Sequence, residues 1–136
     1  FRMANQRHNH IVEAEVHVVL ARDEVTPEGL SFRRFYDLRP VRSRNALFRL
    51  SWTVMHHLQD GILEGFDETV ALQGEGDFSI VASVTGLDTT FHQTVHARHV
   101  YRAEDILFNR RFADIIGRQG HDSWTVDYRR FDETVE

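Results

Sequence analysis

Three histidines near the middle of the chain have the residue type and clustering of a metal site: His92, His96 and His99. Imidazole is a common ligand for transition metals. On a helix, His92 and His96 would lie one turn apart, roughly 6 Å between Cβ atoms, and could share an ion. On a strand, the same two side chains would lie about 13 Å apart at ~3.3 Å per residue. The chemistry therefore depends on the element that carries them.

The stretch 91–101 has the composition of a β-strand, because Thr, Val, Phe and Tyr suit a pleated surface. Alternation places its residues on two faces: Phe91, Gln93, Val95, Ala97, His99 and Tyr101 on one, and His92, Thr94, His96, Arg98 and Val100 on the other. We therefore predict a strand without a metal site. A histidine-rich metal-binding protein is kept as an alternative.

Other candidate groups point to no catalytic site. Glu13 and Glu15 would share a strand face about 6.6 Å apart and could in principle pair as acid and base, but we interpret them as a solvated or interface-facing strand edge. The adjacent His56 and His57 would face opposite ways at a strand end, with one imidazole exposed. The chain lacks a glycine-rich phosphate loop, a nucleophile elbow and an H-E-x-x-H motif. We expect no enzymatic activity and no cofactor.

Composition narrows the class of protein further. The 136 residues suit one domain, and no cysteine is available for disulfides or thiolate chemistry. The net charge is −5 and all basic residues are arginines scattered among acids, so we expect no nucleic-acid partner. No apolar run approaches the ~18 residues of a membrane span. We expect a soluble piece of a longer protein, since the chain opens on Phe1 rather than methionine.

Apolar alternation predicts several short strands. In the first, Val12, Ala14, Val16, Val18 and Leu20 form one face. The predicted strands are 11–21, 31–39, 47–55, 78–85, 91–101 and 124–128, with a short apolar run at 106–108. Turns or loops are predicted at 23–29, 86–90 and 117–123, and one helical turn at 67–72 with Asp67 as N-cap. This pattern indicates an all-β sandwich or barrel with at most short helical turns.

Five segments, in order, resemble the cytoplasmic domain of inward-rectifier potassium channels, most closely the prokaryotic branch. They are Phe1–Arg7 with Val12-Glu13-Ala14; Leu50–His56; Gly86–Tyr101; Glu104-Asp105-Ile106 with Arg111-Phe112; and Val126–Phe131 with Thr134. The resemblance spans essentially all 136 residues. It implies a single regulatory domain, 1–136, with an immunoglobulin-like β-sandwich fold of the E-set type.

The resemblance also implies a gating and assembly role without enzymatic activity. Four copies would enclose a cytoplasmic pathway for potassium ions beneath a bacterial inner-membrane pore, and would couple ligand or lipid signals to it. The gating loop near the four-fold axis would comprise Asp88, Thr89, Thr90, Phe91, His92, Gln93, Thr94 and Val95. A stand-alone immunoglobulin-like binding module that shares only the fold is the alternative.

Specific residues follow from the same resemblance. Arg2 and Arg7 match positions where anionic lipid headgroups act, and arginine binds phosphate bidentately. His17 stands where eukaryotic relatives carry a lipid-linked arginine. Thr89 aligns with an acidic pore residue of those relatives, for which Asp88 is expected to substitute in part. His92 replaces a glycine, and because histidine titrates near neutral pH we hypothesise pH-sensitive gating through it.

Overall fold

The computed structural model describes residues 1–59, 61–65 and 78–136, which form two compact units. The first unit is Phe1–Ile106 and the second is Leu107–Glu136. The expected helical turn at 67–72 and its Asp67 cap lie outside the described residues. Among the described residues, no helix has the length and apolar character needed to cross a membrane.

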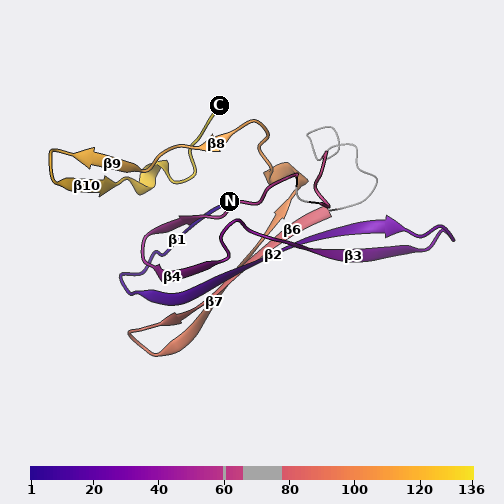
Figure 1. Ribbon diagram of the computed structural model, residues 1–136, viewed down its shortest axis with the longest axis horizontal. Coiled ribbons are helices and arrows are strands. Elements are labelled where there is room, and N and C mark those ends of the chain that lie inside the picture. The colour runs from indigo at the N-terminus through magenta and orange to yellow at the C-terminus, as the bar shows by residue number, and fades with distance from the viewer. Residues whose placement is uncertain (60, 66–77) are drawn as a thin grey trace. The chain divides into compact units, whose positions relative to one another are not determined.

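A five-stranded antiparallel sheet forms one layer of the first unit. Its strands run in the order β3 (Ser31–Leu38), β2 (Ile11–Val25), β6 (Phe78–Asp88), β7 (Gln93–Arg102), and β4 (Arg44–Phe48) pairs with the first part of β2. The long central strand β2 is visible between β3 and β6 in Figure 1. A short 3-10 helix, η1 (Ala103–Asp105), follows β7.

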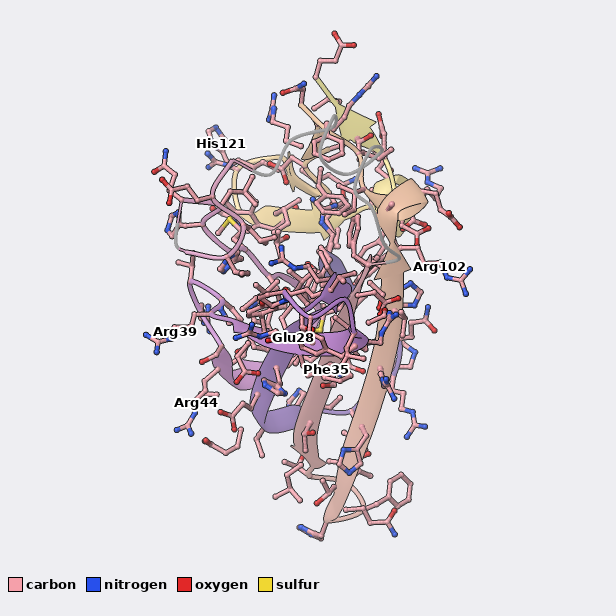
Figure 2. The ribbon with its side chains drawn as sticks, turned by 90° about the vertical axis from the view of Figure 1, so that its right-hand side faces the viewer. Glu28, Phe35, Arg39, Arg44, Arg102 and His121 are labelled. Atoms are coloured by element: carbon pink, nitrogen blue, oxygen red, sulfur yellow. The ribbon has the colours of Figure 1, made fainter. Side chains whose placement is uncertain are left out.

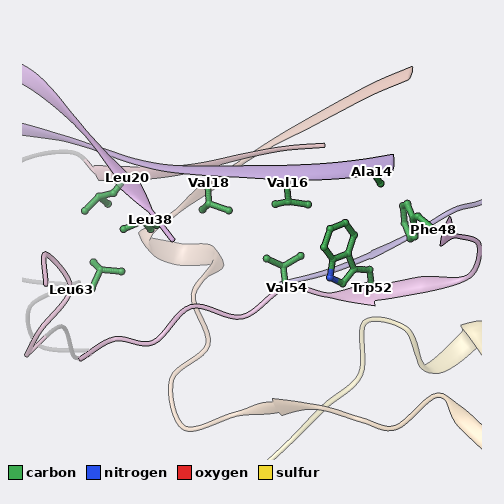
Figure 3. Packing of buried hydrophobic residues seen from close by; sticks show 9 residues of the cluster. All are labelled: Ala14, Val16, Val18, Leu20, Leu38, Phe48, Trp52, Val54 and Leu63. Carbon is green, nitrogen blue, oxygen red and sulfur yellow. The ribbon is translucent and has the colours of Figure 1, made fainter. Parts of the chain in front are cut away.

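A smaller layer covers the inner face of β2. Strand β1 (Arg2–Ala4) pairs with β5 (Ser51–Thr53), and the Phe1 amino group donates to the Val54 carbonyl at 3.1 Å. The buried residues between the layers are Ala14, Val16, Val18, Leu20, Leu38, Phe48, Trp52, Val54 and Leu63. Figure 3 shows the β2 side chains facing Trp52 and Val54 across this core. The predicted apolar face of β2 is therefore confirmed from Ala14 to Leu20.

A β-bulge interrupts β2 where it passes Gly86. The register shifts between Val12 and Glu15, so that Glu13 and Ala14 together oppose one residue of β6. Glu13 has a left-handed backbone (φ 49°). A Cβ atom on Gly86 would lie 2.4 Å from Ile11 Cγ2, so this close approach requires glycine.

The second unit is built from short elements. Strand β9 (Ile116–Gln119) pairs with β10 (Ser123–Val126), and β8 (Arg111–Phe112) pairs with β11 (Thr134–Val135). The 3-10 helix η2 (Tyr128–Arg130) lies between β10 and β11, and Asp127 caps it by accepting from the Arg129 amide. Asp127 also accepts two hydrogen bonds from the Arg129 guanidinium, which hold the pKa of its carboxyl below the usual range.

The fold prediction of an all-β sandwich with only short helical turns is confirmed. Several boundaries were wrong. The single strand expected at 47–55 is two strands, because the chain passes from the larger sheet to the smaller one between Phe48 and Ser51. The turn expected at 117–123 is mostly hairpin, and no strand forms at 106–108. β2 continues to Val25 because its end pairs with β3. That 1–136 is a single domain stays a prediction.

Candidate functional site

The predicted gating loop is the turn of the β6–β7 hairpin together with the start of β7. The last paired residues are Asp88 and Gln93, so the turn itself is residues 89–92. Strand β6 thus takes in the first three residues of the loop expected at 86–90, and residues 89 and 90 belong to the turn. The turn is exposed, and Phe91 has 68% of its surface accessible. His92 has φ 52°, a left-handed conformation that glycine adopts most easily.

Asp88 organises this turn from inside. Its side chain is only 1% exposed, and Oδ1 accepts from the amides of Thr90 at 2.8 Å and Phe91 at 3.4 Å. Oδ2 accepts from the Asn9 side-chain amide. Both side-chain oxygens of Asp88 are therefore engaged within the fold, and its expected role beside an ion pathway stays a prediction.

The charged form of Asp88 is favoured despite its burial. Desolvation alone would raise the pKa of this carboxyl, but hydrogen bonds from Thr90, Phe91 and Asn9 outweigh that effect. The nearby positive charge of Arg7 acts in the same direction, so the pKa of Asp88 lies below its ordinary value. A buried carboxylate with this many donors fixes the turn in one conformation.

The turn is tied to the segment between β1 and β2. The backbone amide and the hydroxyl of Thr89 both donate to the His10 carbonyl, each at 3.2 Å. Asn9 bonds to Asp88 as described. We call these four residues, Asn9, His10, Asp88 and Thr89, the hairpin-tip junction. It joins positions 79 residues apart in the chain.

Asn5 holds the same segment against the sheet. Its side-chain amide donates to the carbonyls of Asn9 at 2.9 Å and Phe48 at 3.3 Å, and its Oδ1 accepts from the Arg7 amide at 3.0 Å. The conformation of residues 5–9 is therefore set by one asparagine whose three polar contacts are all made. A displacement of this segment would reach the turn directly through Asn9 and His10.

The three candidate lipid-contacting residues lie on separate elements. Arg2 is in β1, and Arg7 is exposed in the segment that follows it. His17 lies on the outer face of β2, where its Nε2 is 2.9 Å from the Asp37 carboxylate. The positive charge of Arg7 connects it to the hairpin-tip junction, because that charge favours the ionised form of Asp88.

The histidine stretch is a strand, as predicted, from Gln93 onward. His96 Nδ1 is 3.1 Å from the Thr85 hydroxyl, while His99 makes an edge-to-face contact with Tyr101, with ring centroids 4.5 Å apart. His92 lies in the turn instead. Among residues 1–59, 61–65 and 78–136, no group of three or more potential ligands is close enough to hold a metal.

The remaining candidates from the sequence are kept apart by local structure. The regular spacing assumed for Glu13 and Glu15 is broken by the bulge, and Glu15 instead pairs with Arg44 at 3.4 Å. His56 Nδ1 donates to the Arg39 carbonyl at 2.8 Å, and His57 is exposed. Figure 2 shows Arg39 and Arg44 extending outward from the protein.

Sequence reasoning missed Asn5, Asn9 and Gly86. Neither asparagine lies in a regular element, and each has one hydrogen-bond partner that is far away in sequence, Phe48 for Asn5 and Asp88 for Asn9. The sequence predicts a loop that begins at Gly86, since glycine often interrupts a strand. Glycine within a strand is also a signal of a bulge or a close backbone approach, which is its role here.

Comparison with known proteins gives a consistent result. Residues 1–136 match the family model of the inward rectifier potassium channel C-terminal domain. The chain is 39% identical over 137 residues to the inward rectifier potassium channel Kirbac3.1 of Paramagnetospirillum magnetotacticum, covering 99% of this chain and 45% of that protein.

Animal channels are similar at lower identity. The ATP-sensitive inward rectifier potassium channel 11 of Oryctolagus cuniculus is 27% identical over 99% of this chain and 35% of its own length. The human G protein-activated inward rectifier potassium channel 1 is 28% identical over the whole chain and 28% of its own length. The chain thus spans less than half the length of these relatives.

Proposed function

Since the chain belongs to the inward-rectifier potassium channel C-terminal domain family, we propose that it is the cytoplasmic gating and assembly domain of such a channel. In this role four copies surround a cytoplasmic pathway for potassium ions on the inner face of a bacterial membrane. The domain performs no chemistry. It biases the pore between arrangements that ligands bind with different affinity.

The hairpin-tip junction is the observation that carries the proposal. A loop that gates must keep a defined shape and must respond to a distant signal. The buried Asp88 carboxylate supports the first requirement, and its bond to Asn9 together with the Thr89–His10 bonds supports the second. Residues 88–95 would then surround the axis, with exposed Thr89, Thr90 and Phe91 nearest to it.

The input to this junction would arrive through the segment of residues 5–10. An anionic headgroup bound near Arg2 or Arg7 would displace or hold that segment, and Asn9 and His10 would pass the shift to the turn. His17, being paired with Asp37, contributes less to such a contact. Protonation of exposed His92 would add like charges around the axis and give a second, pH-dependent input.

A chimeric channel tests the proposal. The C-terminal domain of Kirbac3.1 would be replaced by this chain, and potassium flux and channel mass would be measured after reconstitution into liposomes of neutral or anionic lipid. We expect a tetrameric, potassium-conducting chimera whose flux depends on lipid charge. Asp88→Ala and Asn9→Ala are expected to alter that dependence, because each removes the hydrogen bond between Asn9 and Asp88.

Glu24→Ala is the matched control, because Glu24 is a hydrogen-bonded carboxylate in the other long hairpin of the same sheet. It should leave flux and lipid dependence unchanged. A chimera that does not assemble as a tetramer would contradict the assembly role. A conducting tetramer that is indifferent to both junction variants would contradict the coupling role. Flux that is equal at pH 6 and pH 8 in wild type and in His92→Gln would exclude the histidine input.

A further inference from the structure

A cleft of about 400 Å³ opens within the first unit, between the segment after β1 and the inner face of the β6–β7 hairpin. One wall is formed by residues 3–7 and Asn9, and the floor by Ile11 and Phe48. The opposite wall is formed by inner-face and edge positions of the two strands: Val84, Gly86, Val95, His96 and Ala97. This volume is within the range of small-molecule sites.

The side chains of the sheet wall explain why the cleft is hollow. The cross-strand pairs Val84–Ala97 and Gly86–Val95 fill little space. Further along the same face, the pair Ile80–Tyr101 is larger, and Tyr101 packs against Phe1 with ring centroids 5.7 Å apart. Gly86 cannot carry a side chain, because a Cβ atom would meet Ile11. The hollow is therefore a consequence of the bulge that also shapes β2.

The charges around the cleft favour one kind of ligand. Among the residues that the structure describes, the lining contains no carboxylate, and its ionisable members are Arg7 and His96. Asp88, which bonds to the lining residue Asn9, has its two carboxylate oxygens engaged by Asn9 and by the turn amides. The rest of the surface is predominantly apolar. A cation would find no partner here, whereas a carboxylate could pair with the Arg7 guanidinium.

We propose that this cleft binds a compact apolar carboxylate, such as an aryl or short acyl acid, with its anionic group on Arg7 and its apolar body over Ile11, Phe48 and Val95. Such a ligand would bridge the two walls that the hairpin-tip junction already connects. Its binding would stabilise the folded chain in proportion to ligand concentration.

Binding can be measured on the chain itself, independently of any channel activity. The probe is 4-phenylbutyrate, titrated by calorimetry and by backbone amide shifts, with 4-phenylbutanol and 4-phenylbutylamine as neutral and cationic analogues. We expect saturable binding at about 1 mM or tighter for a ligand of this size. The amides of Val84, Gly86 and Ala97 should shift, and both analogues should bind at least about tenfold more weakly.

Two variants separate the cleft from the rest of the surface. Ala97→Phe fills the cleft and should abolish binding, whereas Val100→Phe, on the other face of the same strand, should preserve it. Arg7→Gln should weaken binding about tenfold, and Arg98→Gln should have no effect. Absence of saturable binding, equal binding of the alcohol, or unchanged binding by Ala97→Phe would overturn the proposal. If Arg7→Gln abolished binding to anionic vesicles but not to phenylbutyrate, the arginine would serve a lipid surface and the assigned anion contact would be wrong.

Discussion

Two hairpins of the same sheet end in different ways. The β2–β3 turn closes on itself: the Thr26 amide donates to the Leu30 carbonyl at 2.9 Å, and the Gly29 amide donates to the Thr26 carbonyl at 2.8 Å. The β6–β7 turn is held by Asp88 from inside and by the distant Asn9 and His10. Both tips expose a large apolar residue to the same extent, since Leu30 and Phe91 are each 68% exposed.

Each hairpin contains a hydrogen-bonded carboxylate, but the partners of the two carboxylates lie in different parts of the fold. Glu24 accepts from the Tyr36 hydroxyl and from Arg22, and these bonds, the Tyr36 bond first, hold the pKa of its carboxyl below the usual range. All of its partners belong to β2 and β3. Asp88, in contrast, accepts a hydrogen bond from Asn9, which lies outside its own hairpin. The comparison teaches that exposure at a turn does not reveal its connection to the rest of the fold.

The largest expected effect separates the glycines of the two hairpins. Gly86→Ala should destabilise the chain by about 2 kcal/mol, because the added methyl group overlaps Ile11 in a packed site. Gly29→Ala should cost about 1 kcal/mol, since its φ of 85° is strained for alanine although no atom lies within 4 Å of the added Cβ. Urea unfolding of both variants measures the difference.

The control for this prediction is a double variant. Ile11→Ala removes the atom that the new methyl group meets, so Gly86→Ala should cost less in that background than alone. Equal costs in the two backgrounds would show that the steric account of Gly86 is wrong.

The next effect is on the turn that Asp88 holds. Asp88→Ala should accelerate hydrogen exchange of the Thr90 and Phe91 amides by about tenfold or more, because both lose their acceptor. Glu24→Ala should leave these amides unchanged. Exchange measured by NMR at each amide distinguishes the two hairpins, and protection of Thr90 that survives in Asp88→Ala would contradict the assignment.

The same variant has a pH signature. Because the folded-state pKa of Asp88 is lowered, its contribution to stability is present above the unfolded-state pKa of about 4 and is lost as pH falls through the lower folded-state value. The free energy of unfolding should therefore fall more steeply between pH 5 and pH 3 in wild type than in Asp88→Ala. Parallel curves would mean that Asp88 is not stabilised in its charged form.

The smallest expected effect concerns His17 and Asp37, which form an exposed pair on the outer face of β2 and β3. His17→Gln should change the free energy of unfolding by less than about 0.5 kcal/mol, because both side chains are well solvated. Thermal unfolding at pH 6 and pH 8 measures it. A loss several times larger would show that His17 has a role in the fold beyond its contact with Asp37.

Much of the sheet could be predicted from the sequence, because apolar residues at every second position indicate the buried face of a strand. Ala14, Val16, Val18 and Leu20 all lie in the core as their spacing indicates. The strand predicted at 47–55 is instead interrupted at Leu50, which is 46% exposed because the chain changes sheets there. Strand β9 was missed since an exposed hairpin needs no apolar face to pair, whereas its partner β10 overlaps the strand predicted at 124–128.

The candidate site was predictable only in part. The turn was located from the family resemblance, and its strand from the local residue types. The roles of Asp88 and Asn9 depend on a contact between positions 79 residues apart, which no local pattern encodes. An aspartate in a turn suggests an exposed charge, and only the positions of Thr90, Phe91 and Asn9 show that it points inward.

The central claim is that the β6–β7 turn is controlled from the segment before β2. Hydrogen exchange of the Thr89, Thr90 and Phe91 amides in Asn9→Ala tests this most directly, with exposed Gln6→Ala as the control in the same segment. We predict faster exchange at these three amides in Asn9→Ala, unchanged exchange at Gly29, and wild-type rates throughout in Gln6→Ala. Unchanged exchange at all three turn amides in Asn9→Ala would contradict the claim.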